Sequence, residues 1–137
     1  MTLTVKYVQT EHAAQMWPLI ETYIESAMEH GHGDYTLDQV KLLVCMGQWL
    51  LMVAMDENKN IHGAATASFM NYPNDRVGFI TFMGGKLITS QETFKQMCDI
   101  LKQRGATKVQ GMARPATVRL WKRYGFNERS TLVETRI

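Results

Sequence analysis

The sequence has little cysteine, no long apolar run and no low-complexity segment, and each absence excludes a class of protein. Its two cysteines, Cys45 and Cys98, lie in helix-like apolar patterns, which favours reduced core thiols over a disulfide framework. No stretch approaches the roughly 18–20 apolar residues of a membrane-spanning helix. The first residues lack the basic start and apolar run of a signal peptide, so we expect a cytoplasmic protein.

What is present is the composition of an ordinary globular domain. The chain has 137 residues, of which 45% are hydrophobic and 20% are charged. That length can bury a core without help from disulfides or metals. Because no repeat or linker interrupts the sequence, we predict a single domain over residues 1–137.

The net charge of +2 hides an asymmetry between the two halves. Residues 1–70 hold 3 Lys and Arg against 8 Asp and Glu, whereas residues 71–137 hold 12 against 5. This polarity indicates either an anionic partner for the second half, such as cofactor phosphates, nucleic acid or an acidic protein, or a solvated basic face.

Hydrophobic periodicity predicts a mixed α/β domain. Strands are expected at residues 3–8, 49–55, 61–69, 77–83, 108–112 and 131–137. Helices are expected from Glu11 to a break at His30, from Thr36 to Met46, from Thr89 to Gly105, and from Ala116 to Tyr124. Thr10 is a candidate cap for the first helix, and the Thr36-x-x-Gln39 and Thr89-x-x-Glu92 patterns predict capping boxes for the next two.

The last helix ends in a run that carries a family resemblance, Leu120-Trp121-Lys122-Arg123-Tyr124-Gly125-Phe126. Glycine here supplies the left-handed conformation that stops a helix, and Phe126 opens the next segment. The run resembles the Leu-Tyr-x-x-x-Gly-Phe closing signature of the GNAT N-acetyltransferases. The predicted order β-α-α-β-β-β-α-β-α-β is also the core order of that fold. The resemblance implies a GNAT-like acyl-CoA N-acyltransferase fold with a mixed, mainly antiparallel sheet flanked by helices.

The resemblance also implies a cofactor site. In the family, acetyl-CoA lies where the fourth and fifth strands part, with its pyrophosphate on the N-terminus of the following helix. The glycine signature there, Gln/Arg-x-x-Gly-x-Gly/Ala, corresponds to residues 84–89, where Leu87 and Thr89 replace the later glycines. The cofactor-binding residues implied are Phe82, Met83, Gly84, Gly85, Lys86, Thr89, Ser90, Arg114 and Trp121. As the capping partner of Thr89, Glu92 is expected to occupy backbone donors and to repel a phosphate by about 1–4 kcal/mol.

The catalytic groups depart from the family pattern. In many members a Tyr protonates the departing coenzyme A thiolate, but this chain has Trp121 there, and an indole N–H is no proton donor. Tyr124, three residues on, is the remaining candidate, with a core aromatic as the alternative interpretation. The strand at residues 77–83 has no carboxylate or histidine to act as a general base.

The pattern His30-x-His32-x-Asp34 resembles a metal-ligand constellation, because alternating residues of an extended loop point the same way. No fourth ligand is apparent, and Gly31 and Gly33 favour a helix-terminating loop instead. We therefore assign no metal. In the GNAT fold this loop borders the acceptor substrate, which would place Tyr35 there.

Two functions follow from these features. The first is acetyl transfer from acetyl-CoA to an amine. The second is a catalytically inactive GNAT-fold protein, such as the short GNAT-like proteins of bacteriophages that the chain resembles in size, which would act in a host cytoplasm or a virion. That protein would bind a protein or nucleic acid through Arg119, Lys122 and Arg123, which share one helix face, or would form a homodimer.

Overall fold

The computed structural model describes residues 1–137 as alternating strands and helices. The elements are β1 Thr4–Val8, α1 Thr10–Met28, α2 Leu37–Cys45, β2 Leu50–Met55, β3 Ile61–Asn71, β4 Arg76–Gly85, α3 Gln91–Lys102, β5 Lys108–Gly111 and α4 Pro115–Lys122. The predicted order is confirmed up to the last helix. None of the four helices combines the length and the apolarity that crossing a bilayer requires.

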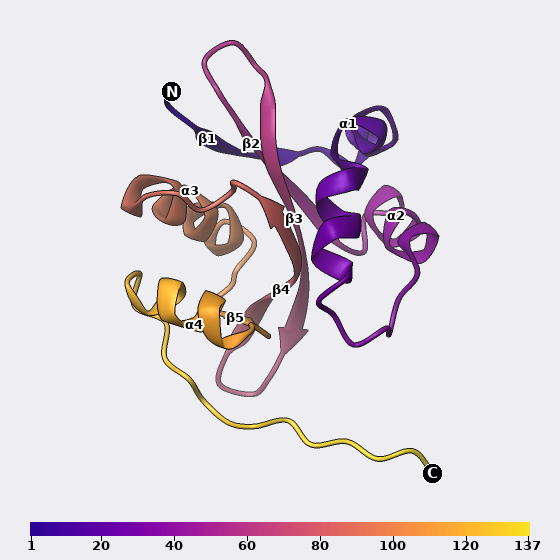
Figure 1. Ribbon diagram of the computed structural model, residues 1–137, viewed down its shortest axis with the longest axis vertical. Helices are drawn as coiled ribbons and strands as arrows, with labels where there is room; N and C mark the ends of the chain where they lie inside the picture. Colours follow the sequence, from indigo (N-terminus) through magenta and orange to yellow (C-terminus); the bar gives the residue numbers. More distant parts are fainter.

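The strands form one sheet in the order β1-β2-β3-β4-β5. Neighbours are antiparallel from β1 to β4, and β4 pairs with β5 in parallel. A parallel pair needs a crossover, which α3 provides. In Figure 1, α1 and α2 cover one face of the sheet and α3 and α4 the other. The mixed, mainly antiparallel sheet predicted from the sequence is confirmed.

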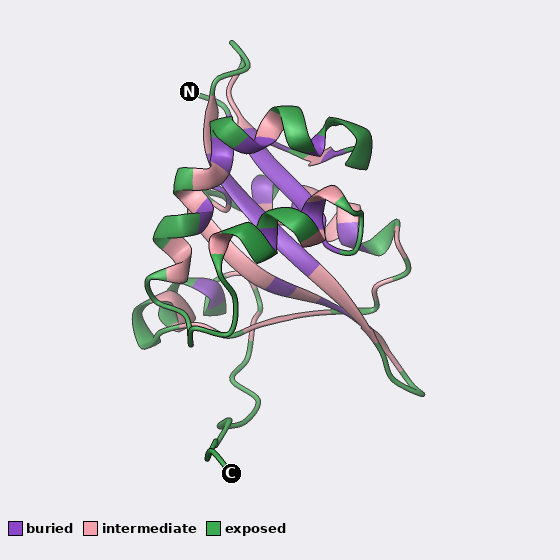
Figure 2. Ribbon diagram, turned by 90° about the vertical axis from the view of Figure 1, so that its right-hand side faces the viewer, coloured by how far each residue is buried: buried purple, intermediate pink, exposed green.

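Two hydrophobic clusters, one on each face, hold the layers together. The first joins α1 and α2 to the sheet through residues such as Trp17, Ile20 and Val40, and the second places Met97 and Leu101 of α3 on the other face. Residues 50–54 of β2 are all buried because both faces of this inner strand are covered. Figure 2 shows this burial concentrated in the central strands.

Three helices stop at glycines with positive φ, namely Gly47 after α2, Gly105 after α3 and Gly125 after α4. After α4, the Phe126 amide donates to the Trp121 carbonyl and the Gly125 amide to that of Lys122, at 3.3 and 3.2 Å. These two bonds define a Schellman motif, so the predicted glycine stop is confirmed.

The helix starts agree with the sequence in part. The Thr36–Gln39 capping box is present and confirmed. The cap of α1 was assigned wrongly: Gln9 is the N-cap, without a side-chain bond, and Thr10 is already helical. Helical backbone at Thr10 removes the extended geometry that a capping side chain needs.

The predicted closing strand at residues 131–137 is wrong for the single chain. Residues 127–137 are exposed and pair with no strand. After α4 the tail runs away from the domain, past the end of the β3–β4 hairpin (Figure 1). A segment with alternating apolar and polar residues becomes a strand only where it meets a free sheet edge. This tail does not run along an edge of its own sheet.

Candidate functional site

The sheet opens into a fork between β4 and β5. Their ladder runs from Val77–Lys108 to Ile80–Gly111, where β5 ends, while β4 continues to Gly85. Residues 81–85 therefore have no strand partner on the β5 side. Their backbone groups along this edge are free to pair with an extended ligand that carries amides.

A β-bulge lies at the point where the fork opens. Ile80 pairs with Ala67 and Phe82 with Thr66, so Thr81 is the extra residue of β4. The hydroxyls of Thr81 and Thr66 lie 2.6 Å apart and hydrogen-bond. A bulge redirects the side chains that follow it. Here it turns Phe82 toward the α1–α2 face.

Phe82 belongs to an aromatic group on that face. Its ring centroid lies 6.2 Å from that of Tyr35 and 6.3 Å from that of Trp49, and Tyr35 and Trp49 meet edge to face at 4.9 Å. Met83, the next residue of β4, packs in the α3 cluster on the opposite side. Phe82 and Met83, both predicted to bind the cofactor, therefore lie on opposite faces of the strand beside the fork.

The end of β4 and the residue after it are held against α1 and β3 by backbone contacts. A Cβ on Gly84 would lie 1.9 Å from the Tyr23 carbonyl oxygen, and Gly85 has a φ of +69° beside the His62 carbonyl. The Lys86 amide donates to that same carbonyl at 2.8 Å. These close backbone contacts explain why both positions are glycine, and a bound phosphate is not needed to explain them. The Lys86 side chain is exposed and makes no ion pair.

The cap of α3 differs from the prediction. Ser90, not Thr89, is the N-cap, and its hydroxyl accepts from the Thr93 amide at 3.2 Å. The Thr93 hydroxyl in turn accepts from the amides of Thr89 and Ser90, at 2.9 and 3.1 Å. The predicted Thr89–Glu92 box is wrong because a β-hydroxyl at residue 93 reaches both preceding amides.

Glu92 consequently has another role. Its carboxylate accepts from the Gln96 side chain at 3.3 Å, one turn along the helix. The amides of Gln91 and Glu92 at the helix end have no acceptor. The N-terminus of α3 thus keeps two free backbone donors, together with one negative side chain in its first turn.

Aromatic rings join α4 to α3 and to the fork. Trp121 is the one buried residue after Leu101. A Cβ on Gly111 would lie 3.2 Å from its ring and 3.6 Å from the Ile80 Cβ, so the indole lies over the last pair of the β4–β5 ladder. The position predicted to bind the cofactor therefore borders the fork.

Tyr124, the catalytic candidate, packs between the helices. Its ring stacks on Phe94 of α3 at 5.4 Å, and Phe126 contacts both Phe94 and Trp121 at 5.6 and 4.8 Å. This placement matches the core-aromatic interpretation.

The basic candidates lie on the surface. Arg114 is exposed at the N-cap position of α4 and makes no side-chain cap. Arg119, Lys122 and Arg123 are exposed along the same helix, and Lys122 lies 3.8 Å from Glu128. The structure thus shows one basic group at the start of α4 and three at its end, without a converging cluster.

The His30–Asp34 loop covers Phe82. A Cβ on Gly31 would lie 3.5 Å from the Phe82 ring. No group of three or more His, Cys, Asp or Glu side chains converges on one point, so these loop residues do not form a ready metal centre. The loop and its aromatic floor form the wall of the site on the α1–α2 face.

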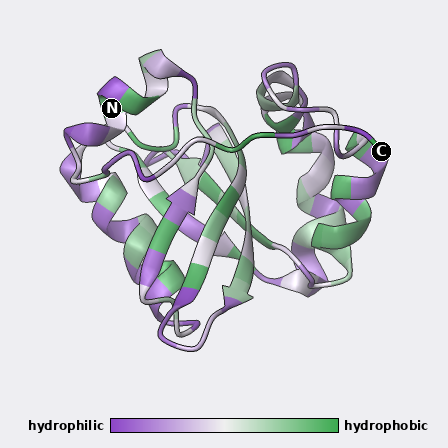
Figure 3. Cartoon of the chain, turned by 90° about the horizontal axis from the view of Figure 1, so that it is seen from below, coloured by the Kyte–Doolittle hydropathy of each residue, from purple (hydrophilic) through white to green (hydrophobic).

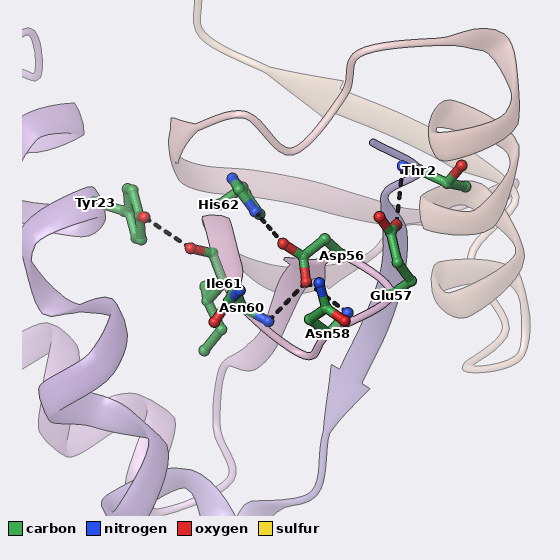
Figure 4. Close-up of polar contacts among 8 residues, drawn as sticks. All are labelled: Thr2, Tyr23, Asp56, Glu57, Asn58, Asn60, Ile61 and His62. Carbon is green, nitrogen blue, oxygen red and sulfur yellow. Dashed lines mark hydrogen bonds and ion pairs between the residues drawn. The ribbon is translucent and has the colours of Figure 1, made fainter.

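The sequence prediction missed a polar cluster in the β2–β3 hairpin, shown in Figure 4. Asp56 Oδ2 lies 2.9 Å from His62 Nε2, and Asp56 Oδ1 accepts from the amides of Asn58 and Asn60. The His62 hydrogen bond, followed by the Asn60 amide, lowers the pKa of Asp56 to about 2. The facing positions of Asp56 and His62 across a short turn are the signal that would have revealed the pair.

A cavity of about 360 Å³ lies away from the fork, near the start of β4. Arg76 and Arg104 line it, stacked over Phe69 and Tyr7 at 4.5 and 3.8 Å. The Arg76 Nε donates to the Arg104 carbonyl at 2.9 Å and so satisfies a carbonyl just after the end of α3. Because none of the predicted site residues borders this cavity, we place the candidate site at the fork.

Comparisons with known proteins agree on the fold. No protein-family model matches the chain, and no curated protein matches its sequence. An aminoglycoside acetyltransferase from an uncultured soil metagenomic sample superimposes with a TM-score of 0.69 at 12% identity, covering 98% of this chain and 95% of that one. Glucosamine-6-phosphate N-acetyltransferase from Arabidopsis thaliana gives 0.65 at 11% identity, covering 99% of each.

A third similar structure was solved with a ligand. It is a predicted acetyltransferase from Clostridium acetobutylicum with acetyl-CoA, with a TM-score of 0.62, 17% identity, and coverage of 98% of this chain and 96% of that one. At such identities the likeness establishes the fold and leaves function to the site. The chain has the GNAT acetyltransferase fold.

Proposed function

We propose that the chain binds acetyl-CoA in the fork between β4 and β5 and transfers the acetyl group to an amine. The observation that carries this proposal is the fork itself, where the ladder stops at Ile80–Gly111 while β4 continues to Gly85. An unpaired strand edge in this fold can pair with the amides of an extended cofactor arm.

The surrounding residues suit each part of such a ligand. Trp121 and Met83 give the fork apolar walls on the α3–α4 side. The free amides of Gln91 and Glu92 and the exposed Lys86 offer donors and a positive charge to phosphates. The negative charge of Glu92 would repel phosphates, so phosphate binding would depend on the backbone donors and Lys86 together.

Acetyl-CoA, when bound, supplies the acetyl group as an activated thioester. The chain's own contribution is to position the reacting groups and to polarise the carbonyl under attack. Backbone N–H groups along residues 81–85 can donate to an oxygen on which negative charge develops. The acceptor amine would approach from the face where the His30–Asp34 loop covers Phe82.

Protonation of the leaving thiolate is the unusual step. Trp121 occupies the border of the fork without a titratable group, and Tyr124 stacks on Phe94. A thiol has an ordinary pKa of about 8.5, so a thiolate can leave unprotonated, although more slowly than with an acid. We infer that this chain would transfer the acetyl group without a side-chain general acid: the C–N bond would form as the C–S bond breaks, the thiolate would leave, and the amine proton would pass to water.

Calorimetry with acetyl-CoA tests binding, and a matched pair of lysine variants tests its place. Lys86→Ala removes a charge from the segment that leads into α3, whereas Lys102→Ala removes one from the last turn of that helix. We expect about fivefold to tenfold weaker binding for the first, from the loss of roughly 1 kcal/mol, and no change for the second. Absence of any binding at millimolar acetyl-CoA would reject the enzyme proposal.

Restoring a phenol tests the chemistry. Trp121→Tyr places a titratable hydroxyl at the border of the fork, and Trp121→Phe is the control with a similar loss of packing. We expect kcat for acetyl transfer to be about tenfold or more higher in the Tyr variant than in the Phe variant. Equal rates would show that residue 121 does not reach the leaving group.

One observation favours a non-catalytic second function. Arg119, Lys122 and Arg123 are all exposed on α4, at the spacing that aligns them on one face. Such a stripe can bind phosphates of nucleic acid or an acidic protein. Retention on nucleic acid that falls steeply with salt, together with no acetyl-CoA binding, would favour this function.

A further inference from the structure

The cavity of about 360 Å³ near the start of β4 is basic and has no acidic residue in its lining. Arg76 and Arg104 are its only charged residues, and neither takes part in an ion pair. Asp75, beside Arg76 in the chain, is occupied by Lys108 at 3.0 Å and by the Thr107 hydroxyl at 2.9 Å. Two positive charges therefore border one cavity without a counter-charge from the protein, which favours an anionic ligand.

Aromatic rings hold both guanidinium groups in place. The guanidinium carbon of Arg104 lies 3.8 Å from the centroid of the Tyr7 ring, and that of Arg76 lies 4.5 Å from the Phe69 centroid. The ring face covers one side of a stacked guanidinium and leaves its N–H groups pointing outward in the plane. This is the geometry in which an arginine binds two oxygens of one phosphate or carboxylate.

Only part of each guanidinium is used within the protein. Arg76 donates from Nε to the Arg104 carbonyl at 2.9 Å and from Nη1 to the Asn71 side chain at 2.7 Å. Arg104 donates from Nη1 to the Ile100 carbonyl at 3.4 Å. Its Nε and the Nη2 groups of both arginines have no acceptor in the chain. Binding the carbonyls at the end of α3 thus leaves most of the N–H donors free.

The start of α1 adds backbone donors to the same place. Thr10, the first residue of this 19-residue helix, lines the cavity. The N-cap Gln9 makes no side-chain bond, so the amides of Thr10 and Glu11 have no acceptor. Glu11 is in the first turn but does not line the cavity. The positive end of the helix dipole therefore acts in the same direction as the two arginines.

Most of the remaining lining is apolar and comes from both hydrophobic clusters. Val8 and Trp49 belong to the α1–α2 cluster, and Leu50 belongs to the α3 cluster. Figure 3 shows the strands between helices on both sides, and the cavity lies where β1 stops at Val8 and β2 begins at Leu50. Apolar walls, a few polar groups and a volume of a few hundred Å³ are typical of a small-molecule site.

We propose that this cavity binds a small phosphate monoester with an apolar body, at a site separate from the fork. The phosphate would lie between Arg76, Arg104 and the start of α1, and the apolar body would pack against Trp49 and Leu50. A phosphate monoester carries close to two negative charges at neutral pH, which balances two unpaired guanidinium groups. A single carboxylate would leave one positive charge unbalanced.

Calorimetry in a buffer without phosphate tests the class of ligand. Phenyl phosphate, benzoate and benzyl alcohol present a similar ring with about two, one and no negative charges. We expect phenyl phosphate to bind about tenfold or more tightly than benzoate, and benzyl alcohol not to bind measurably. Inorganic phosphate, which lacks the ring, should bind more weakly than phenyl phosphate. No binding of phenyl phosphate at millimolar concentration would overturn the proposal, and equal binding of benzoate would overturn the assignment of a phosphate.

Two charge-matched variants test the role of the arginines. Arg104→Gln and Lys102→Gln each remove one positive charge near the end of α3, but Lys102 does not line the cavity. We expect affinity for phenyl phosphate to fall about tenfold or more in the first variant and to stay unchanged in the second. Equal losses would show only a general attraction to positive charge and would overturn the site. Circular dichroism of both variants checks that they fold.

Indole N–H signals in NMR spectra locate the ligand in the unaltered chain. Trp49 lines the cavity, whereas Trp121 lies over the last pair of the β4–β5 ladder beside the fork. We expect phenyl phosphate to shift the Trp49 signal and to leave the Trp121 signal in place, with Trp49→Phe and Trp121→Phe used to assign the two. A shift of the Trp121 signal alone would place the phosphate at the fork and refute a separate site. Because this measurement needs no acetyl-CoA, its result is independent of the acetyl-transfer proposal.

Discussion

Residues 1–101 and residues 102–137 are built differently. Every buried residue but one lies in the first region, and Trp121 is the exception. The first region is held by two hydrophobic clusters and by close backbone crossings. The second is attached through the short β4–β5 ladder and, beyond β5, through the aromatic group around Phe94. The family resemblance lies in the weakly buried region, so the residues that indicate the fold are not those that stabilise it.

The most severe way to test this difference is a matched pair of glycine substitutions. In Gly84→Ala the new Cβ would lie 1.9 Å from the Tyr23 carbonyl, and neither backbone can move without disturbing α1 and β4. We expect a loss of about 4 kcal/mol or more in the free energy of unfolding. Gly125→Ala meets nothing within 4 Å and bears only the cost of its φ of +97°, about 1–2 kcal/mol. Urea denaturation of both variants gives the comparison, and equal losses would contradict it.

A smaller effect is expected from Trp121→Ala. Removing a buried aromatic costs about 3 kcal/mol, but the loss should fall on α4 and the fork rather than on the whole chain. Hydrogen exchange should therefore speed up at α4 and β5 while the amides of β2 and β3 stay protected. The control Trp17→Ala, in the first cluster, should raise exchange throughout. Uniform exchange in both variants would mean that the chain unfolds as one unit.

The smallest expected effect is a loss of stability in acid, and it is confined to the first region. The folded pKa of Asp56 is about 2, below its ordinary 3.8, chiefly because of the His62 hydrogen bond. A lowered pKa means that the carboxylate stabilises the hairpin fully above pH 3.8 and loses this effect as the pH falls toward 2. Carboxyl NMR of Asp56 should show a midpoint near the lower value, and a midpoint at the ordinary one would refute the pairing.

Much of this arrangement could be predicted from the sequence, because it depends on local pattern. The strands of the sheet follow from apolar periodicity, and the stops at Gly105 and Gly125 follow from glycine chemistry. The cap at Ser90 could not be predicted as readily, since Thr89 and Ser90 are both good capping residues. Only the hydroxyl of Thr93, which binds both preceding amides, decides between them.

The site itself depends on register, which a single sequence does not encode locally. The bulge at Thr81 and the end of the ladder at Gly111 are properties of strand pairs, so the fork could be expected only from the family resemblance. The tail is the clearest failure. Its pattern indicates a strand, and the single chain offers it no edge.

The crossing of Gly84 over Tyr23 has a consequence for how this protein can evolve. Main-chain atoms of α1 and β4 touch directly there, so the spacing of the two elements is set by backbone rather than by any side chain. Side chains around the fork can therefore be substituted without changing the spacing of α1 and β4. A saturation scan should tolerate many residues at Phe82 or Met83 and almost none at Gly84, a mutational asymmetry that leaves the lining of the fork free to diversify on an unchanging support.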